Sequence, residues 1–259
     1  MTAGLVDAGA RSQIDDFGFF RNLATVMAIV QVTGFAVHFA LGRSSFSAPL
    51  VIHAHAVVFM GWVAIFVIQP WLAKAGAMGF HRTLGRVAAF WAVGLLVLGL
   101  LVTWETVRIG RTPFFFQPQH FLIANPLTLL GALGLLAAAI ILRKHHDWHP
   151  RLQIGSFVLL MGPGFGRLLP MPFLTPYAFE IASLAALVFV AVAIGREAWQ
   201  RKPIHPAWAC TALVLVGALL FSRILAETPF GEALHAAAVA GTAAAGSDGM
   251  AFPPPPPGL

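Results

Sequence analysis

The stretch 50–73, LVIHAHAVVFMGWVAIFVIQPWLA, contains no Asp, Glu, Lys or Arg and is long enough to cross a bilayer as one α-helix. Similar apolar stretches recur along the chain and are separated by short basic connectors. Backbone groups inside lipid must bond internally, which leaves helices or a closed barrel, and continuous apolar runs favour helices over alternating barrel strands. The sequence therefore predicts an all-α, polytopic membrane helical bundle.

The composition supports a membrane protein and argues against a nucleic-acid-binding one. Hydrophobic residues make up 58% of the 259 positions and charged residues 10%, far from the values of soluble domains. The basic residues flank the apolar stretches instead of forming a patch with interleaved aromatics, so we expect contact with membrane lipids and not with nucleic acid. Cys210 is the only cysteine, which excludes an intrachain disulfide.

About seven transmembrane helices are expected, at residues 23–41, 50–73, 87–107, 121–142, 152–169, 175–195 and 207–225. Pro49 and the pair Thr175–Pro176 are start signals for the second and the sixth. The fifth contains MGPGFG at 161–166, whose Pro163 would kink or interrupt a helix.

The chain outside these spans divides into two parts. Residues 1–22 carry Asp and Arg before the first apolar run, so we expect a cytoplasmic N-terminal arm and no cleavable signal peptide. Residues 226–259 end in PPPPPGL and predict a low-complexity tail that is extended or disordered, with one short surface helix at 230–242. The transmembrane bundle is then residues 23–225.

Basic residues in the connectors predict the orientation. The connectors after the second, fourth and sixth spans are the more basic, with Lys74, Arg82, Arg86, Arg143, Lys144, Arg151, Arg196, Arg201 and Lys202. Cytoplasmic loops carry an excess of Lys and Arg. We therefore expect a multi-pass protein of the bacterial inner membrane, with its N-terminus in the cytoplasm and its tail outside.

A two-helix unit occurs twice. The second span begins near His55 and the third follows FHRTLGR, whereas the fourth begins just after His120 and the fifth follows WHPRLQIG. Each copy has a histidine at the outer start of one helix and a His-x-x-Leu turn before the next. This pattern indicates a repeated hairpin, although so few matching residues leave coincidence as an alternative.

Helical spacing places the polar side chains of the spans on defined faces. In the second span, His55, Trp62 and Gln69 share one face, whereas His53 lies about 200° away round the helix. The predicted topology gathers seven polar residues in the outer third of the bundle: His38, His55, Glu105, His120, Arg167, Glu180 and Arg223.

Two interpretations of this outer group are open. In the structural one, Glu105 pairs with Arg108 and Arg167 pairs with Glu180, while the histidines cap helices or reach the interface. In the functional one, His55 and His120 ligate haem b or, as the less favoured choice, copper. His38, Arg167, Trp62 and Gln69 would then complete the cofactor site, with an arginine on the haem propionates.

The segment RKHHDWHPR at 143–151 resembles the histidine boxes of membrane di-iron desaturases and hydroxylases. It supplies His145, His146 and His149, and on the same side only His81 and His205 would join them. That number is too small for the histidine-rich sites of those enzymes. We therefore favour an interfacial loop over a di-iron site.

The motifs HAHAVVFMGW (53–62), FHRTLGR (80–86), HPRLQIG (149–155) and GRLLP (166–170), with Gln69, resemble a group of uncharacterised bacterial membrane proteins. The resemblance covers about residues 50–170 and implies a multi-helix inner-membrane fold without an established activity. A looser likeness to cytochrome b561-type haem bundles rests on the histidines that alternate along successive helices. It implies an outer pair, His55 with His120, and an inner pair, His81 with His149, which we expect in connectors more than in helices.

The leading hypothesis is an inner-membrane redox protein that exchanges electrons with a quinone or with a respiratory or photosynthetic membrane complex. The alternative class is a cofactor-free accessory subunit or a small transporter, in which the same polar residues pair helices or line a pathway. The chain contains no GxSxG, P-loop, HExxH or CxxC motif. Because these motifs are absent, none of them gives a reason to assign an enzyme activity.

Overall fold

The computed structural model describes residues 2–43 and 47–255, with side chains described from residue 16 onward, and this part of the chain is all-α. The elements in chain order are α1 (Thr2–Ala40), α2 (Leu50–Lys74), α3 (Met78–Arg108), α4 (Pro118–Ile141), α5 (Trp148–Leu159), α6 (Gly162–Leu168), the 3₁₀ turn η1 (Met171–Leu174), α7 (Ala178–Ala185), α8 (Leu187–Trp199), α9 (Pro206–Ala226) and α10 (Pro229–Val239). The predicted polytopic helical bundle is confirmed.

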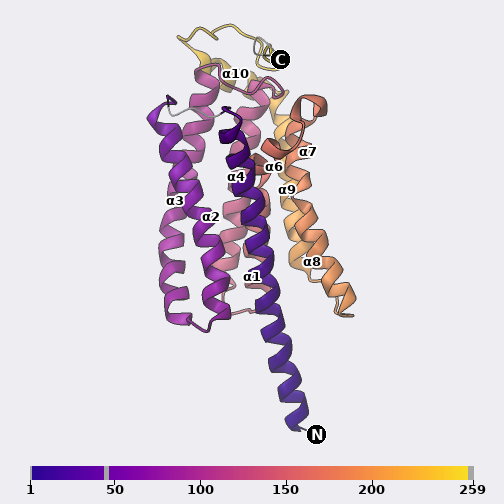
Figure 1. Ribbon diagram of the computed structural model, residues 1–259. Helices are drawn as coiled ribbons and strands as arrows, with labels where there is room; N and C mark the ends of the chain where they lie inside the picture. Colours follow the sequence, from indigo (N-terminus) through magenta and orange to yellow (C-terminus); the bar gives the residue numbers. More distant parts are fainter. Residues whose placement is uncertain (1, 44–46, 256–259) are drawn as a thin grey trace.

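Six helical segments in the described chain are long and apolar enough to cross a membrane: 16–40, 50–74, 78–108, 118–141, 178–199 and 206–226. The remaining pass is made by α5 and α6 together, since α5 begins at the end where α4 finishes and α7 lies at the opposite end (Figure 1). The N- and C-termini lie at opposite ends. We call these the inner end and the outer end, after the expected orientation.

The fifth pass is interrupted where Pro163 predicts an interruption. Helix α5 ends at Leu159 and α6 begins at Gly162, with Pro163 in its first turn. Proline lacks the N–H that a continuous helix would bond to the carbonyl of Leu159, and its ring would clash with that carbonyl. The fifth span, predicted at 152–169, therefore consists of the two short helices α5 and α6.

Several helices extend beyond the predicted boundaries. Residues 2–22, predicted as an arm, belong to α1, and α3 begins at Met78 and not at residue 87. The turns FHRTLGR and WHPRLQIG consequently lie mostly inside α3 and α5. Arg82 and Arg86 are exposed and can reach water from a helix that continues past its apolar part. In the sixth pass, α7 begins at Ala178, after the predicted start at Thr175–Pro176.

Glycines allow helices to approach closely on both sides of the fifth pass. A Cβ on Gly34 of α1 would lie 2.5 Å from the carbonyl oxygen of Gly164 on α6, and one on Gly155 of α5 would overlap Thr211 of α9. Small residues at helix contacts are how membrane bundles gain van der Waals packing. The broken pass is therefore held tightly between α1 and α9.

A buried ion pair joins α5, α8 and α9 at the inner end. Arg151 donates from Nε to Oε1 of Glu197 over 2.8 Å, and the indole N–H of Trp208 donates to the same oxygen over 3.0 Å. The backbone N–H of His205 donates to the other carboxylate oxygen over 2.8 Å. Glu197 is 3% exposed and Arg151 is 7% exposed. The carboxylate of Glu197 thus links three helices, with both of its oxygens accepting hydrogen bonds.

The C-terminal region folds over the outer end instead of extending away. Helix α10 corresponds to the short surface helix predicted at 230–242. Beyond it, the backbone N–H of Gln119 donates to the carbonyl of Gly249 over 2.9 Å, and the amide of Gln117 donates to that of Met250 over 2.7 Å. The tail as far as residue 255 therefore differs from the extended or disordered segment expected from its composition.

Candidate functional site

Two histidines meet at the inner end, where α3 and α5 begin. His81 of α3 and His149 of α5 have ring centres 6.3 Å apart and ring planes at 82°. Nδ1 of His81 lies 3.2 Å from the carbonyl oxygen of Gln69 on α2, and Nδ1 of His149 lies 2.8 Å from that of Ala139 on α4. Both side chains are partly buried.

The carbonyl contacts assign the protons on both rings. A carbonyl oxygen only accepts hydrogen bonds, so Nδ1 of each ring carries the hydrogen and Nε2 keeps its lone pair in the neutral form. An imidazole whose other ring nitrogen donates to a backbone carbonyl has the arrangement usual for histidines that ligate metals. His81 and His149 are therefore two oriented imidazoles with an available nitrogen each.

The same pair gives the predicted repeat a physical meaning. In the α2–α3 hairpin, a histidine in the first turns of the second helix bonds to a carbonyl near the end of the first helix. The α4–α5 hairpin has the same contact at the equivalent place. The resemblance to haem bundles implied this inner pair but in connectors, whereas the structure places both histidines inside helices.

Along α2, the predicted stripe has three buried polar atoms without a hydrogen-bond partner in the described structure: Nδ1 of His55, Nε1 of Trp62 and Oε1 of Gln69. The His55 ring lies against Phe59, with centres 4.0 Å apart, and bonds to the backbone of Leu98 on α3. Trp62 is 4% exposed and lies in the core. An unpartnered polar atom at such depth is costly unless water or a ligand completes it.

Arg167 of α6 lies at the outer end near two of the predicted histidines. Its guanidinium lies over the Phe35 ring of α1, 4.0 Å from the ring centre, and Nη1 donates to the carbonyl of Pro163 over 2.8 Å. His38 and His55 both lie within range of its charge. Its Nε has no partner in the described structure. Arg167 therefore lies in the same outer region of the bundle as His38 and His55.

The predicted ion pair between Arg167 and Glu180 is wrong. Glu180 of α7 pairs with Arg223 of α9 instead, with Nε of Arg223 3.0 Å from the carboxylate. Helical spacing identifies the face on which a charge lies but not the helix that will pack against it. The expected pair between Glu105 and Arg108 is confirmed, at 2.7 Å.

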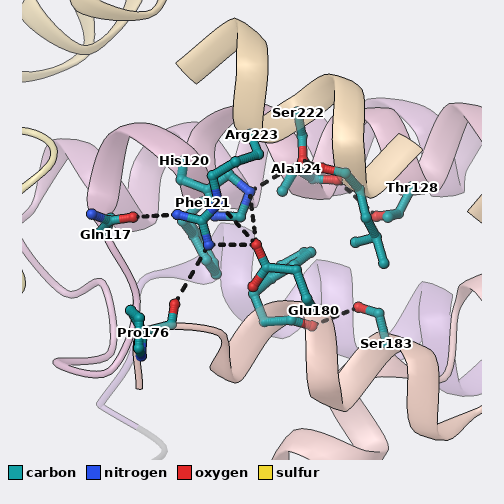
Figure 2. Close-up of polar contacts among 12 residues, drawn as sticks. Gln117, His120, Phe121, Ala124, Thr128, Pro176, Glu180, Ser183, Ser222 and Arg223 are labelled. Atoms are coloured by element: carbon teal, nitrogen blue, oxygen red, sulfur yellow. Dashed lines mark hydrogen bonds and ion pairs between the residues drawn. The ribbon is translucent and has the colours of Figure 1, made fainter. Parts of the chain in front are cut away.

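His120 belongs to the network of Glu180 and Arg223, not to the outer region around His55 and Arg167. Its Nε2 lies 3.1 Å from the hydroxyl of Ser222, which itself donates to the carbonyl of Leu219, so the imidazole N–H is the donor. Figure 2 shows Arg223 between Gln117, Pro176 and Glu180, beside His120. The groups are mutually bonded and tie α4, α7 and α9 together, which favours a structural role for His120.

The histidines of the segment 143–151 do not form a larger centre. His205 lies 3.3 Å from the carboxylate of Asp147. Burial acts to raise the pKa of Asp147, but hydrogen bonds from its own backbone, His205 and Trp148 outweigh it and lower the pKa overall. Across the residues that the structure describes, no group of three or more His, Cys, Asp or Glu side chains could hold a metal ion.

Comparison of the chain with family models, curated proteins and solved structures found no match. The side chains and their geometry are therefore the basis for assigning a function. Of the predicted site residues, Trp62, Gln69 and His55 lie on α2, and His38 and Arg167 join His55 at the outer end. The resemblance to haem bundles implied the pairing of His81 with His149, but the position of both histidines inside helices was missed, although the His-x-x-Leu repeat is a signal that both turns belong to helices.

Proposed function

We propose that this chain is a redox protein of the bacterial inner membrane that holds haem b between His81 and His149. Its electron partner would be a quinone or a membrane complex. The observation that carries the proposal is the pair of neighbouring imidazoles, 6.3 Å apart between ring centres and each with Nδ1 bonded to a backbone carbonyl. Bound haem would supply one-electron transfer.

The separation of the two rings is one that a single iron held by both histidines would allow. With metal–nitrogen bonds of about 2.0 Å, the ring centres of two imidazoles on one metal would lie no more than about 6–7 Å apart. The observed separation is 6.3 Å. Copper sites commonly use three or more protein ligands, so a pair of histidines favours haem over copper.

The chain's own residues would orient the group and balance its charge. The hydrogen bonds from Nδ1 to the carbonyls of Gln69 and Ala139 orient both rings and leave Nε2 of each as the nitrogen that would bind the iron. Arg82 and Lys144 are exposed at the same end and are suited to the carboxylates of the haem edge. The proposed cofactor site is therefore at the inner end, in contrast to the outer site expected from His55 and His120.

Visible difference spectra of the purified protein and its variants test the proposal. Reduced-minus-oxidised haem bands are expected in the wild type and should disappear in His81→Gln and in His149→Gln. The matched controls are His145→Gln, an exposed neighbour, and His120→Ala, which should both keep the bands. Loss of the bands in His55→Ala and His120→Ala, with full retention in His81→Gln, would return the cofactor to the outer site.

The unpartnered polar atoms along α2 support a second candidate function, a small transporter or a hydrated pathway. The observation is that Trp62 is nearly inaccessible yet its indole N–H has no partner among the residues that the structure describes. By contrast, the indole N–H of Trp91 donates to the carbonyl of Val58 over 2.8 Å. Internal water molecules would supply the hydrogen bonds that such atoms lack. Hydroxyl-radical labelling should then modify Trp62 faster than Trp91. Slower labelling of Trp62 than of Trp91 would contradict this second function, a hydrated pathway without a cofactor.

A further inference from the structure

A hollow of about 270 Å³ lies at the outer end between the ends of α3 and α4, helix α10 and the C-terminal segment that folds back over them. Figure 1 shows α10 and this C-terminal segment at the outer end of the bundle. Its walls are largely apolar and include Val107, Val239, Phe252 and Pro253. The volume is slightly below that of typical small-molecule sites, which are mostly apolar with a few placed polar groups.

Four polar side chains line the hollow, those of Thr112, His235, Ser247 and Asp248, and the hydroxyl of Thr112 lacks a partner in the described structure. Thr112 is 6% exposed, and its hydroxyl oxygen has no hydrogen-bond partner in the described structure. His235 of α10 is 4% exposed, and Asp248 belongs to the returning segment. A buried hydroxyl without a partner is costly. A ligand atom in the hollow would complete it.

The charge of the lining selects the sign of the ligand. Of the lining residues in the described chain, Asp248 is the only one with a formal charge, and the neighbouring Arg111 is exposed and does not line the hollow. Burial lowers the pKa of His235, and the smaller effect of Asp248 raises it. His235 therefore offers a neutral ring with one accepting nitrogen, and the exposed carboxylate of Asp248 places a negative charge at the rim of the hollow.

We propose that this hollow is a binding site for a small primary ammonium compound with an apolar body. A primary ammonium group has three donors and no acceptor. The Thr112 hydroxyl, the neutral His235 ring and the Asp248 carboxylate are three acceptors on the lining of one hollow. The apolar body would lie against Val107 and Phe252. This site is at the opposite end of the bundle from His81 and His149 and does not depend on haem.

The segment that carries Asp248 is docked in a defined position. A Cβ on Gly249 would lie 2.6 Å from the His235 ring and 2.7 Å from the side-chain oxygen of Gln119. The backbone N–H of Met250 donates to Oδ1 of Asp248 over 2.8 Å. Glycine at 249 thus allows the segment to close over α10 and brings Asp248 to the edge of the hollow.

Benzylamine and its neutral analogue benzyl alcohol are suitable probes, with binding measured by ligand-observed NMR on the purified full-length protein. Benzylamine should bind about tenfold more tightly than benzyl alcohol, as expected for a charge-assisted contact. Asp248→Asn keeps an oxygen for Met250 and should remove this preference, and Thr112→Val should weaken both probes. Glu232→Gln changes an exposed carboxylate on α10 outside the hollow and should have no effect.

Two results would overturn the proposal. One is equal binding of benzylamine and benzyl alcohol to the wild type. The other is an unchanged preference in Asp248→Asn, provided that the protection of residues 240–255 from protease shows that the segment is still docked. Neither result bears on haem at the inner end, because the visible spectrum reports that site separately.

Discussion

Removing the carboxylate of Glu197 should be among the most destabilising single changes in the bundle. Glu197→Ala leaves the 7%-exposed guanidinium of Arg151 without its counter-charge and frees the N–H groups of Trp208 and His205. Breaking a buried pair in this way costs about 3–5 kcal/mol, because an uncompensated charge stays buried. The free energy of unfolding, measured by denaturant titration in mixed micelles, should fall by about that amount.

Two further variants make the reasoning refutable. Arg151→Met combined with Glu197→Leu removes both charges, and should restore most of the stability that Glu197→Ala loses. Glu105→Ala breaks the exposed pair with Arg108 and should leave stability unchanged, because exposed pairs are screened by water. A loss in Glu197→Ala no larger than that in Glu105→Ala would show that the network does not fasten α5, α8 and α9.

Reporter fusions should place the loops after α2, α4 and α8 in the cytoplasm and residue 245 outside; a cytoplasmic tail would contradict the orientation. Gly34→Leu should lower the free energy of unfolding by about 1–3 kcal/mol, because its Cβ would meet the carbonyl of Gly164. Gly134→Ala should leave the free energy of unfolding unchanged, because a Cβ at that position meets nothing within 4 Å. Burial lowers the pKa of His235, so docking of residues 240–255 should be complete above about pH 6.5 and weaken as the pH falls below it, as His235 must then be protonated. Limited proteolysis should therefore accelerate at about pH 5 in the wild type but not in His235→Phe.

The helices could be predicted from the sequence, but not where they end. Apolar length is sufficient to identify a membrane pass, and Pro163 is sufficient to predict its interruption. The start of α3 at Met78 was missed because apolar runs mark only the part of a helix inside hydrocarbon. A helix whose arginines reach water continues past that part.

Helical spacing predicted which polar residues of the site share a helix face, but not which residues they contact. His55, Trp62 and Gln69 were placed on one face by helical spacing, and all three have unpartnered polar atoms there. The partner of Glu180 and the surroundings of His120 depend on which helices pack together. That information is long-range, and the spacing of residues within one helix does not contain it.

Electron paramagnetic resonance of the oxidised protein tests the central claim most directly. Two histidines bound to one haem iron would give a low-spin centre, and with the rings of His81 and His149 kept at an angle near 82° its signal would be strongly anisotropic. This signal should be present in the wild type and absent from His81→Gln and His149→Gln. A high-spin signal, a low-spin signal typical of parallel rings, or a signal unchanged in both variants would contradict the inner histidine pair as the cofactor site.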